Sequence, residues 1–230
     1  MIDDFLDLLV RTPAPPGCAN PYTIHEPAVD ATPDAPTIRL RQLRGYLERR
    51  MGQTDLVLVA EAPGYQGARF SGIAMTCERT LLGLKPAVPA ELVLAPGTPV
   101  TRTSRPETGR NKPERAGGFS EPTASCVWGE MIRHGISDRT VLWNVFPFHP
   151  RKGDDPLTNR TPTGTEVADH LHILTAMLDL LGQPRIVCIG RTSQNHLAAS
   201  HPYAPAIRHP ANGGVPKFRE GLAEVIAARG

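Results

Sequence analysis

Three continuous apolar runs constrain the fold of this chain more than any other feature of its sequence. They are "DLVLVA" at 55–60, "TVLWNVF" at 140–146 and "RIVCIG" at 185–190. A strand that is buried on both faces has this pattern, and such strands occur in parallel sheets that helices cover. We therefore expect an α/β fold with a central, mostly parallel sheet.

Helix-like segments alternate with the apolar runs. Their spacing predicts helices at 2–10, 38–51, 127–136 and 165–182, and a short strand at 206–208 with a closing helix at 215–229 completes the pattern. Such alternation predicts a three-layer α/β/α fold around four strands. A chain of 230 residues suits a single domain, 1–230, of this kind.

Two segments stand outside the alternation. Residues 1–37 form an N-terminal helix followed by a proline-rich arm, which we expect to be irregular between Thr12 and Pro36. Residues 93–123 show no periodicity and are predicted to be an irregular basic insertion. Its basic residues are either solvated loop charges or contacts for phosphate, and charge alone leaves both open. They are Arg102, Arg105, Arg110, Lys112 and Arg115.

Composition excludes several classes of protein. The net charge of +2 does not by itself indicate a nucleic-acid partner, and the four cysteines stand singly without a C-x-x-C pair. Neither a disulfide framework nor a zinc site is therefore expected. The acidic start is unlike a signal peptide, and no apolar run is long enough to cross a membrane. We expect a cytoplasmic monomer with reduced thiols, no metal and no cofactor.

Polar side chains follow the predicted strands at the points where the strands end. Glu61 follows the first run, Asn144 lies near the end of the second, His149 follows the second, and His209 follows the last short strand. In parallel α/β sheets, ligands bind outside the carboxyl ends of the strands. These four side chains are therefore expected to meet in one cleft.

The three strand ends read "AEAPG" with "RFSG", then "WNVFPFHP", then "HPANGG". In this order they resemble the uracil-DNA glycosylase superfamily, over residues of about 55 to 220. The resemblance implies a DNA repair glycosylase that flips uracil out of single- or double-stranded DNA and hydrolyses its N-glycosidic bond, leaving an abasic site.

The resemblance also implies a role for each residue at the strand ends. Phe70 would stack against the flipped base, and Asn144 would read its Watson-Crick edge. His209 would donate a hydrogen bond to the base oxygen on which negative charge develops. Glu61 would orient the attacking water and stabilise the cationic sugar.

The sequence departs from some branches of the superfamily. Ala62 stands where several branches place an Asp or Asn that handles water, so the chain resembles the branches with a Glu-Ala-Pro-Gly turn, and His149 is a second candidate for the water. Gly64 stands where a uracil-selective branch has a Tyr, and Tyr65, Phe146 or Phe148 could supply the missing bulk. The iron-sulfur branch has a cysteine just after the Asn strand. This chain has none there, so no cluster is expected.

The remaining contacts to DNA would be electrostatic and made by the backbone. We expect them at Ser71, Gly72, Arg191, Asn212, Gly213 and Gly214. No lysine belongs to the predicted cleft, so nothing supports a Schiff-base step. Three alternatives stay open: a glycosylase for hypoxanthine or xanthine, a DNA-binding module of the same fold without turnover, and an unrelated α/β hydrolase acting on a nucleoside or small glycoside.

Overall fold

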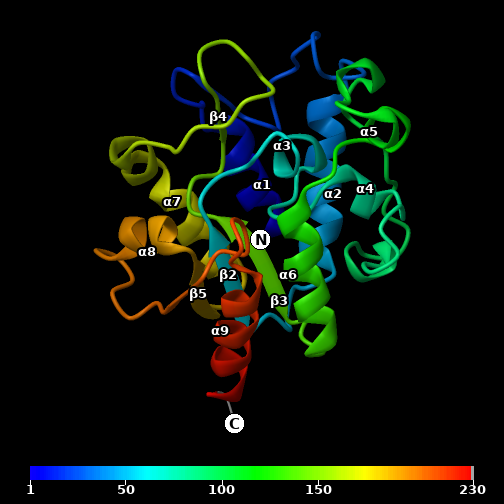
Figure 1. Cartoon of the computed structure of the whole chain (residues 1–230). Helices are drawn as coiled ribbons and strands as arrows, with labels where there is room; N and C mark the ends of the chain where they lie inside the picture. Colours follow the sequence, from blue (N-terminus) through cyan, green and yellow to red (C-terminus); the bar gives the residue numbers. More distant parts are fainter. Residues whose placement is uncertain (229–230) are drawn as a thin grey trace.

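The three apolar runs form the centre of a parallel sheet in the computed structural model, which describes residues 1–228 (Figure 1). Within these residues the strands β2 (Leu56–Ala60), β3 (Thr140–Asn144), β5 (Arg185–Ile189) and β6 (Ala206–Ile207) lie in the order β3-β2-β5-β6. All neighbouring strands of this sheet run parallel. The predicted α/β fold is confirmed.

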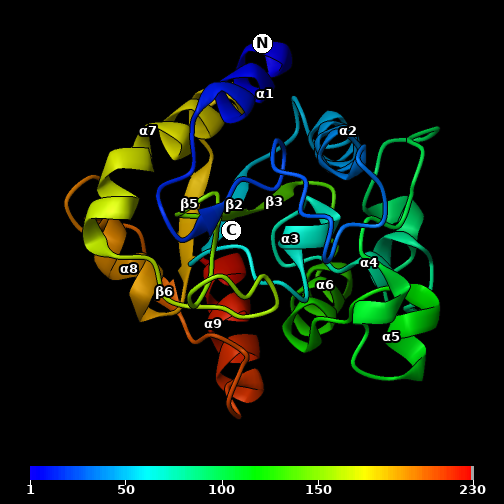
Figure 2. The same cartoon turned by 90° about the horizontal axis from the view of Figure 1, so that it is seen from above.

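Helices cover both faces of the sheet (Figure 2). One face carries α1 (Ile2–Arg11), α7 (Gly164–Leu180) and α8 (Arg191–Leu197), and the other carries α6 (Pro122–Arg133) and α9 (Val215–Ala227). Every residue of β2 and β3 is buried between these layers. The continuous apolar runs are thus explained, since each side chain of such a strand meets a helix.

The helix α2 (Ala35–Glu48) and the turn after it close the exposed edge of the sheet at β3. The Tyr46 hydroxyl accepts the backbone N–H of Leu142 at 2.6 Å, and Nε of Arg50 donates to the carbonyl of Thr140 at 3.0 Å. An open edge strand leaves unpaired backbone groups that invite pairing with other chains. Here side chains satisfy two of those groups.

Two helices begin earlier than periodicity predicts. We expected a start at residue 38 for α2 and at 127 for α6, and they begin three and five residues upstream, with Pro36 and Pro122 in their first turns. Proline is tolerated there because the first N–H groups of a helix have no intrahelical partner. The last residue of the expected closing helix, Arg229, lies outside the described residues.

The proline-rich arm is fastened to the body of the protein. Its strand β1 (Cys18–Ala19) pairs antiparallel with β4 (His149–Pro150). Farther along, the buried carboxylate of Asp30 pairs with the guanidinium of Arg39 at 2.9 Å and with that of Arg69 at 3.1 Å. Removal of one partner of such a buried pair would leave an uncompensated charge.

The basic insertion is more regular than expected, which corrects the sequence prediction. Its chain wraps around the buried carboxylate of Glu78, which accepts backbone N–H groups of Thr103, Ser104 and Phe119. The Asn111 side chain caps the helix that follows it. The shorter helical elements are α3 (Ala68–Ser71), α4 (Glu78–Leu81), η1 (Ala90–Leu92), η2 (Pro106–Thr108) and α5 (Lys112–Gly117).

The arginines of the insertion make contacts within it and to the proline-rich arm. Arg102 donates to the carbonyl of Arg115 at 2.6 Å, and Arg105 donates to that of Pro27 at 2.7 Å. Arg110 pairs with the carboxylate of Glu114 at 2.6 Å. These contacts give the basic residues a structural role, since they satisfy backbone carbonyls of irregular chain.

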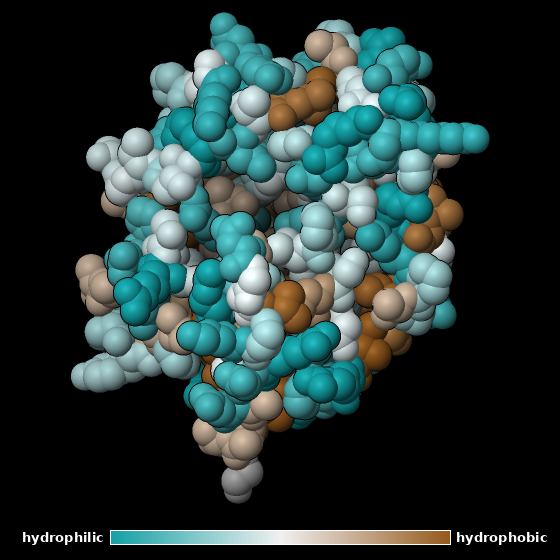
Figure 3. Space-filling model, in the orientation of Figure 1, coloured by the Kyte–Doolittle hydropathy of each residue, from teal (hydrophilic) through white to brown (hydrophobic). Residues whose placement is uncertain are grey.

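The surface view in Figure 3 shows hydrophilic residues over most of one face, with apolar residues in scattered spots. Among residues 1–228, no helix combines the length and the apolar character that crossing a bilayer requires. The same residues hold no group of three or more His, Cys, Asp or Glu side chains placed to bind a metal ion.

Candidate active site

Three adjoining hollows lie at the carboxyl edge of the sheet. The inner cavity is lined by Glu61, Asn144 and His209, which the structure brings together from the ends of β2, β3 and β6. The remaining lining residues of the inner cavity are Ala60, Ala62, Pro63, Gly64, Ala68, Met75 and Glu121.

A groove and an outer cavity flank the inner cavity. The groove shares Glu61 and His209 with it and runs along Gly190 and Arg191 at the start of α8. The outer cavity shares Gly64 and Glu121 with the inner cavity. At about 70 Å³ the inner cavity is small beside the ~300–1,000 Å³ of ordinary ligand pockets, so a bound base must also occupy space at its mouth.

Asn144 presents a free amide to the inner cavity. The residue is only 5% exposed, and its side chain makes no hydrogen bond to another residue among 1–228. Buried amides are normally paired, because an unmade hydrogen bond in the interior costs free energy. One donor and one acceptor at the end of β3 are therefore available to a ligand.

His209 is held in one tautomer. Its Nδ1 atom accepts the backbone N–H of Ala211 at 3.1 Å, so the proton of the neutral ring lies on Nε2. Burial lowers the pKa of His209, and the positive charge of Arg208 lowers it further. The ring is thereby kept as a neutral hydrogen-bond donor beside the cavity.

Gly214 supports the turn that carries His209. A Cβ atom at position 214 would lie 2.0 Å from the carbonyl oxygen of His209, so only glycine fits there. The sequence suggested a contact between Gly214 and DNA. The structure instead packs this buried residue beneath the histidine loop.

Glu61 lies where the inner cavity meets the groove. Its backbone carbonyl accepts the N–H of Phe146 at 3.0 Å, which ties the turn after β2 to the end of β3. Its carboxylate makes no hydrogen bond to another described residue and faces a space shared with His209. The neighbouring Ala62 adds only an apolar wall to the cavity.

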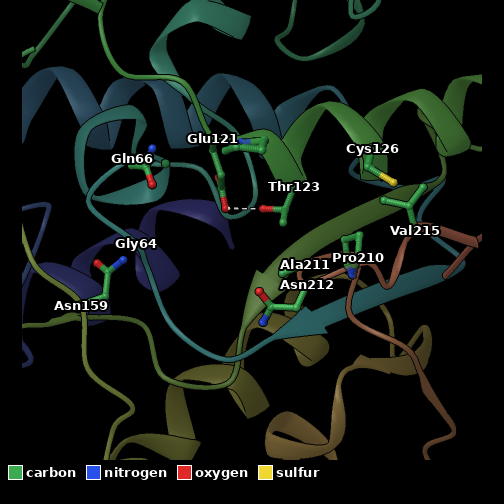
Figure 4. Close-up of a pocket in the computed structure, with 12 residues that line it drawn as sticks. Gly64, Gln66, Glu121, Thr123, Cys126, Asn159, Pro210, Ala211, Asn212 and Val215 are labelled. Atoms are coloured by element: carbon green, nitrogen blue, oxygen red, sulfur yellow. Dashed lines mark hydrogen bonds between the residues drawn. The ribbon is translucent and has the colours of Figure 1, made fainter. Parts of the chain in front are cut away.

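Glu121, which the sequence did not predict, lines both the inner cavity and the outer cavity, and Figure 4 shows it among the residues of the outer cavity. Its Oε1 atom accepts the hydroxyl of Thr123 at 3.0 Å, while its Oε2 atom is buried without a hydrogen-bond partner. The residue as a whole is partly exposed, but the carboxyl group is enclosed, and burial raises the pKa of Glu121 to about 6. It lies just before α6, in sequence without periodicity, so no local signal marks it.

His149 lies outside the three hollows. Its Nε2 atom donates to the carbonyl of Thr158 at 2.9 Å and to Oδ1 of Asn159 at 3.2 Å. Burial, together with the charge of Arg69, lowers the pKa of His149 to about 4. The predicted role in holding water is therefore not available to this buried side chain in the structure.

Asn159 is a second polar residue that the sequence reading missed. Its Oδ1 atom accepts both the His149 ring N–H and the backbone N–H of Tyr65 at 3.0 Å. Its Nδ2 atom would lie 3.5 Å from a Cβ at Gly64, at the wall of the outer cavity. His149 thus positions an amide that holds the turn after β2.

The structure places two predicted base contacts away from the cavity. Phe70 is fully buried and stacks on Phe119, with ring centroids 5.0 Å apart and an interplanar angle of 15°. Tyr65 packs edge-on against Phe119 and accepts a hydrogen bond from Arg110 at 3.4 Å. Neither ring lines the three hollows, because Phe119 of the insertion covers them both.

Ser71 and Gly72 are likewise in the interior. The Ser71 hydroxyl donates to the carbonyl of Thr76 at 2.6 Å, and the carbonyl of Gly72 accepts the Tyr22 hydroxyl at 2.9 Å. A Cβ at position 72 would lie 2.5 Å from the carbonyl oxygen of Arg39. In this structure these two residues pack the arm and α2 and do not reach the surface.

The other predicted DNA contacts lie at the groove. Arg191 and Asn212 line it, and Asn212 also lines the outer cavity. Asn212 and Gly213 are exposed and both have positive φ, at 51° and 71°, which makes a tight turn at the rim. A cationic side chain and exposed backbone N–H groups at one groove are suited to phosphate.

Fold and site together define an α/β protein with a polar pocket that opens beside a basic groove at the carboxyl edge of its sheet. The family model described as the uracil DNA glycosylase superfamily matches residues 50–226, and the chain belongs to this superfamily. Members of the superfamily are DNA glycosylases, hydrolases of base excision repair that act on DNA, and the chain is a DNA glycosylase at this level.

A solved structure supports the same fold. The chain is similar to the crystal structure of wild-type SMUG2 from Pedobacter heparinus, with a TM-score of 0.61 and 13% sequence identity. The match covers 98% of this chain and 96% of that one. A comparison with curated protein sequences found no match.

Proposed function

We propose that this protein removes uracil from DNA by hydrolysing the N-glycosidic bond of a flipped nucleotide. The observation that carries the proposal is the inner cavity, where the free amide of Asn144 and the neutral ring of His209 meet Glu61. These groups match the three needs of the reaction: selection of the base, stabilisation of the departing anion and stabilisation of the sugar cation.

Asn144 selects the base. The Watson-Crick edge of uracil offers the N3–H donor beside the O4 acceptor, and an amide pairs with both at once. Cytosine presents an acceptor at N3 and a donor at N4, so the same amide orientation would face it with two mismatched contacts. The burial of Asn144 strengthens this discrimination, because a polar group left unpaired there cannot form a hydrogen bond to water instead.

His209 stabilises the leaving group. As the glycosidic bond breaks, negative charge grows on the oxygens of the base, and Nε2–H of His209 is the donor available to receive it. A neutral donor that is fixed in place before the reaction needs no reorganisation at the transition state. The hydrogen bond from Ala211 supplies that fixed orientation.

Glu61 acts on the sugar side. It lies between the inner cavity and the groove that Arg191 lines, so a DNA backbone in the groove would bring its sugar next to this carboxylate. There the negative charge stabilises the oxocarbenium-like sugar and orients a water molecule toward it.

We also propose a monofunctional enzyme that works as a monomer in the cytoplasm. No lysine is among the described residues that line the three hollows, so no amine is placed to form a Schiff base. All four cysteines are free, which suits a reducing compartment. The face in Figure 3 shows no broad apolar area of the kind that permanent interfaces use.

Oligonucleotides with a single uracil test the proposal. They are presented single-stranded, opposite guanine and opposite adenine, and the products are treated with alkali. Alkali-dependent strand cleavage is expected, because an abasic site is left intact by a monofunctional enzyme. Retarded mobility without cleavage would instead identify a DNA-binding module, and no binding or cleavage on any substrate would overturn the proposal.

A larger deaminated base, hypoxanthine or xanthine, is the second candidate. The outer cavity, of about 470 Å³, adjoins the inner cavity at Gly64 and Glu121, and Gly64 contributes no side chain there. A purine needs more room than a pyrimidine, and this space could receive it. Oligonucleotides carrying these bases, tested beside uracil, decide the order of preference.

A further inference from the structure

Glu121 carries an enclosed carboxylate with one oxygen, Oε2, for which neither the fold nor the proposed reaction supplies a partner. Its Oε2 atom has no hydrogen-bond partner among residues 1–228, although the atom is shielded from solvent. The residue precedes α6, yet its side chain does not cap that helix. An enclosed carboxylate oxygen without a hydrogen-bond partner costs stability, so the fold by itself gives no reason for Oε2.

Figure 4 shows the Glu121 carboxylate held by Thr123 and pointing into the space near Asn212. Gly67 packs directly against the carboxylate. A Cβ atom at Gly67 would lie 2.1 Å from Oε2 of Glu121, so a larger residue there would displace the carboxylate from its present position. The hydrogen bond from Thr123 fixes one oxygen and leaves the other for a ligand.

The arrangement of the hollows places Glu121 on the base side of the site. Glu61 and His209 face both the inner cavity and the groove, whereas Glu121 and Gly64 face both the inner and the outer cavity. A nucleotide whose backbone lies in the groove therefore turns the far edge of its base toward Glu121. A group attached to that edge would extend past Gly64, which has no side chain of its own, toward Glu121.

We propose that Glu121 is a specificity-determining residue that accepts a hydrogen bond from a hydroxyl or amino substituent on the base edge facing the outer cavity. The inference rests on the proposed glycosylase function. A carboxylate acceptor favours such a protic group and disfavours an apolar one of the same size, because the apolar group leaves the acid desolvated and unpaired.

The matched probes are oligonucleotides with 5-methyluracil and with 5-hydroxymethyluracil, which differ by one hydroxyl group, and uracil is the reference. At about pH 8 the Glu121 carboxyl is ionised, since its pKa is about 6. The wild type is expected to excise the hydroxymethyl base about tenfold or more faster, in kcat/KM, than the methyl base. In Glu121→Ala this ratio is expected to fall to about one, while uracil excision changes less than about threefold.

The control is Glu220→Ala, which removes an exposed acid from α9 and should leave the ratio unchanged. The melting temperature of Glu121→Ala is also expected to be no lower than that of the wild type, because the variant loses a desolvated carboxylate. A lower melting temperature would point to a structural role. If Glu121→Ala excises uracil and keeps the wild-type ratio between the hydroxymethyl and methyl bases, the role of Glu121 is overturned while the proposed glycosylase function stands.

A binding measurement keeps the inference testable without turnover. The free bases 5-hydroxymethyluracil and thymine are added to the wild type and to Glu121→Ala, and saturation-transfer NMR compares their affinities. Preference for the hydroxymethyl base that disappears in the variant supports the inference, and equal affinities in the wild type contradict it. If no base is excised but this preference is present, the proposed catalysis fails while the role of Glu121 stands.

Discussion

The backbone N–H of Ala211 donates a hydrogen bond to Nδ1 of His209 at 3.1 Å, and this contact decides which ring nitrogen faces the inner cavity. An Nδ1 atom that accepts cannot carry the proton, so the neutral ring offers Nε2–H as its donor. The turn between His209 and Ala211 therefore prepares the group that would receive the charge of a departing base.

Replacement of this donor should affect the chemical step. His209→Ala is expected to lower kcat by about 10²–10³-fold, the usual cost of removing one donor to a developing oxyanion. DNA binding should survive, because Arg191 and Asn212 of the groove are unchanged. Single-turnover rates and binding isotherms on uracil-containing DNA separate the two effects, and a loss confined to affinity would contradict the assigned role.

The pH profile provides a second measurement of the same contact. Burial and Arg208 lower the pKa of His209, so the active neutral ring persists into mild acid. Protonation of Nδ1 at lower pH removes the acceptor for the Ala211 N–H and disrupts the turn. We expect kcat/KM to fall as pH drops through this lowered pKa. A fall of kcat/KM on the acid side with an apparent pKa above the usual histidine range would show that another group controls the rate.

Gly214→Ala tests the support beneath His209. The added methyl would lie 2.0 Å from the carbonyl oxygen of His209, and backbone must move to relieve the clash. We expect a loss of about 1–3 kcal/mol in the free energy of unfolding and a lower kcat. Gly129→Ala on α6 is the control, since a Cβ there meets nothing within 4 Å and alanine favours the helix. Equal effects of the two variants would show that the close approach is unimportant.

Asn144→Asp tests base selection. A carboxylate can accept from N3–H of uracil but cannot donate to O4, and its charge repels that oxygen. We expect kcat/KM on uracil to fall at least about tenfold, and the preference for uracil over cytosine to narrow because the carboxylate accepts from the cytosine amine. Competition assays with both bases measure the preference. Unchanged uracil excision would remove Asn144 from the pocket.

The strands and the polar residues at their ends could be predicted because their signals are local. A continuous apolar run marks a strand covered on both faces, and Glu61 and Asn144 follow from where two such runs end. His209 is found in the same way from a much shorter strand. The convergence of these residues then follows from the rule that parallel strands end at one edge.

The positions of other residues depend on distant chain and could not be predicted in this way. Phe70 looked available for stacking, but Phe119 of the insertion covers its ring. Ser71 and Gly72 looked like backbone donors, but the arm and α2 bury them through Tyr22 and Arg39. Glu121 enters the site from a segment without periodicity, so only the three-dimensional packing reveals it.

Glu61→Gln tests the charge next to the sugar. The amide keeps the shape of the side chain but loses its attraction for a cationic sugar, so kcat is expected to fall about 10–100-fold with little change in affinity for DNA. Glu91→Gln, which alters an exposed acid of η1, serves as the control. Full activity of Glu61→Gln would assign the water to another group.

The buried ring of His149 should make the stability of the protein sensitive to acid. Its pKa is about 4 in the folded chain and about 6.5 when unfolded, so the unfolded state binds a proton first as pH falls. The contribution of the neutral, buried ring to the free energy of unfolding is fully present above pH 6.5. It is lost as pH falls from 6.5 to about 4, by up to about 3 kcal/mol. His149→Gln keeps a donor for Thr158 and Asn159 but does not titrate, so its free energy of unfolding should fall less with pH. Urea unfolding at several pH values measures how the free energy of unfolding of the wild type and of His149→Gln changes with pH. The same change in both proteins would assign the acid sensitivity to other groups.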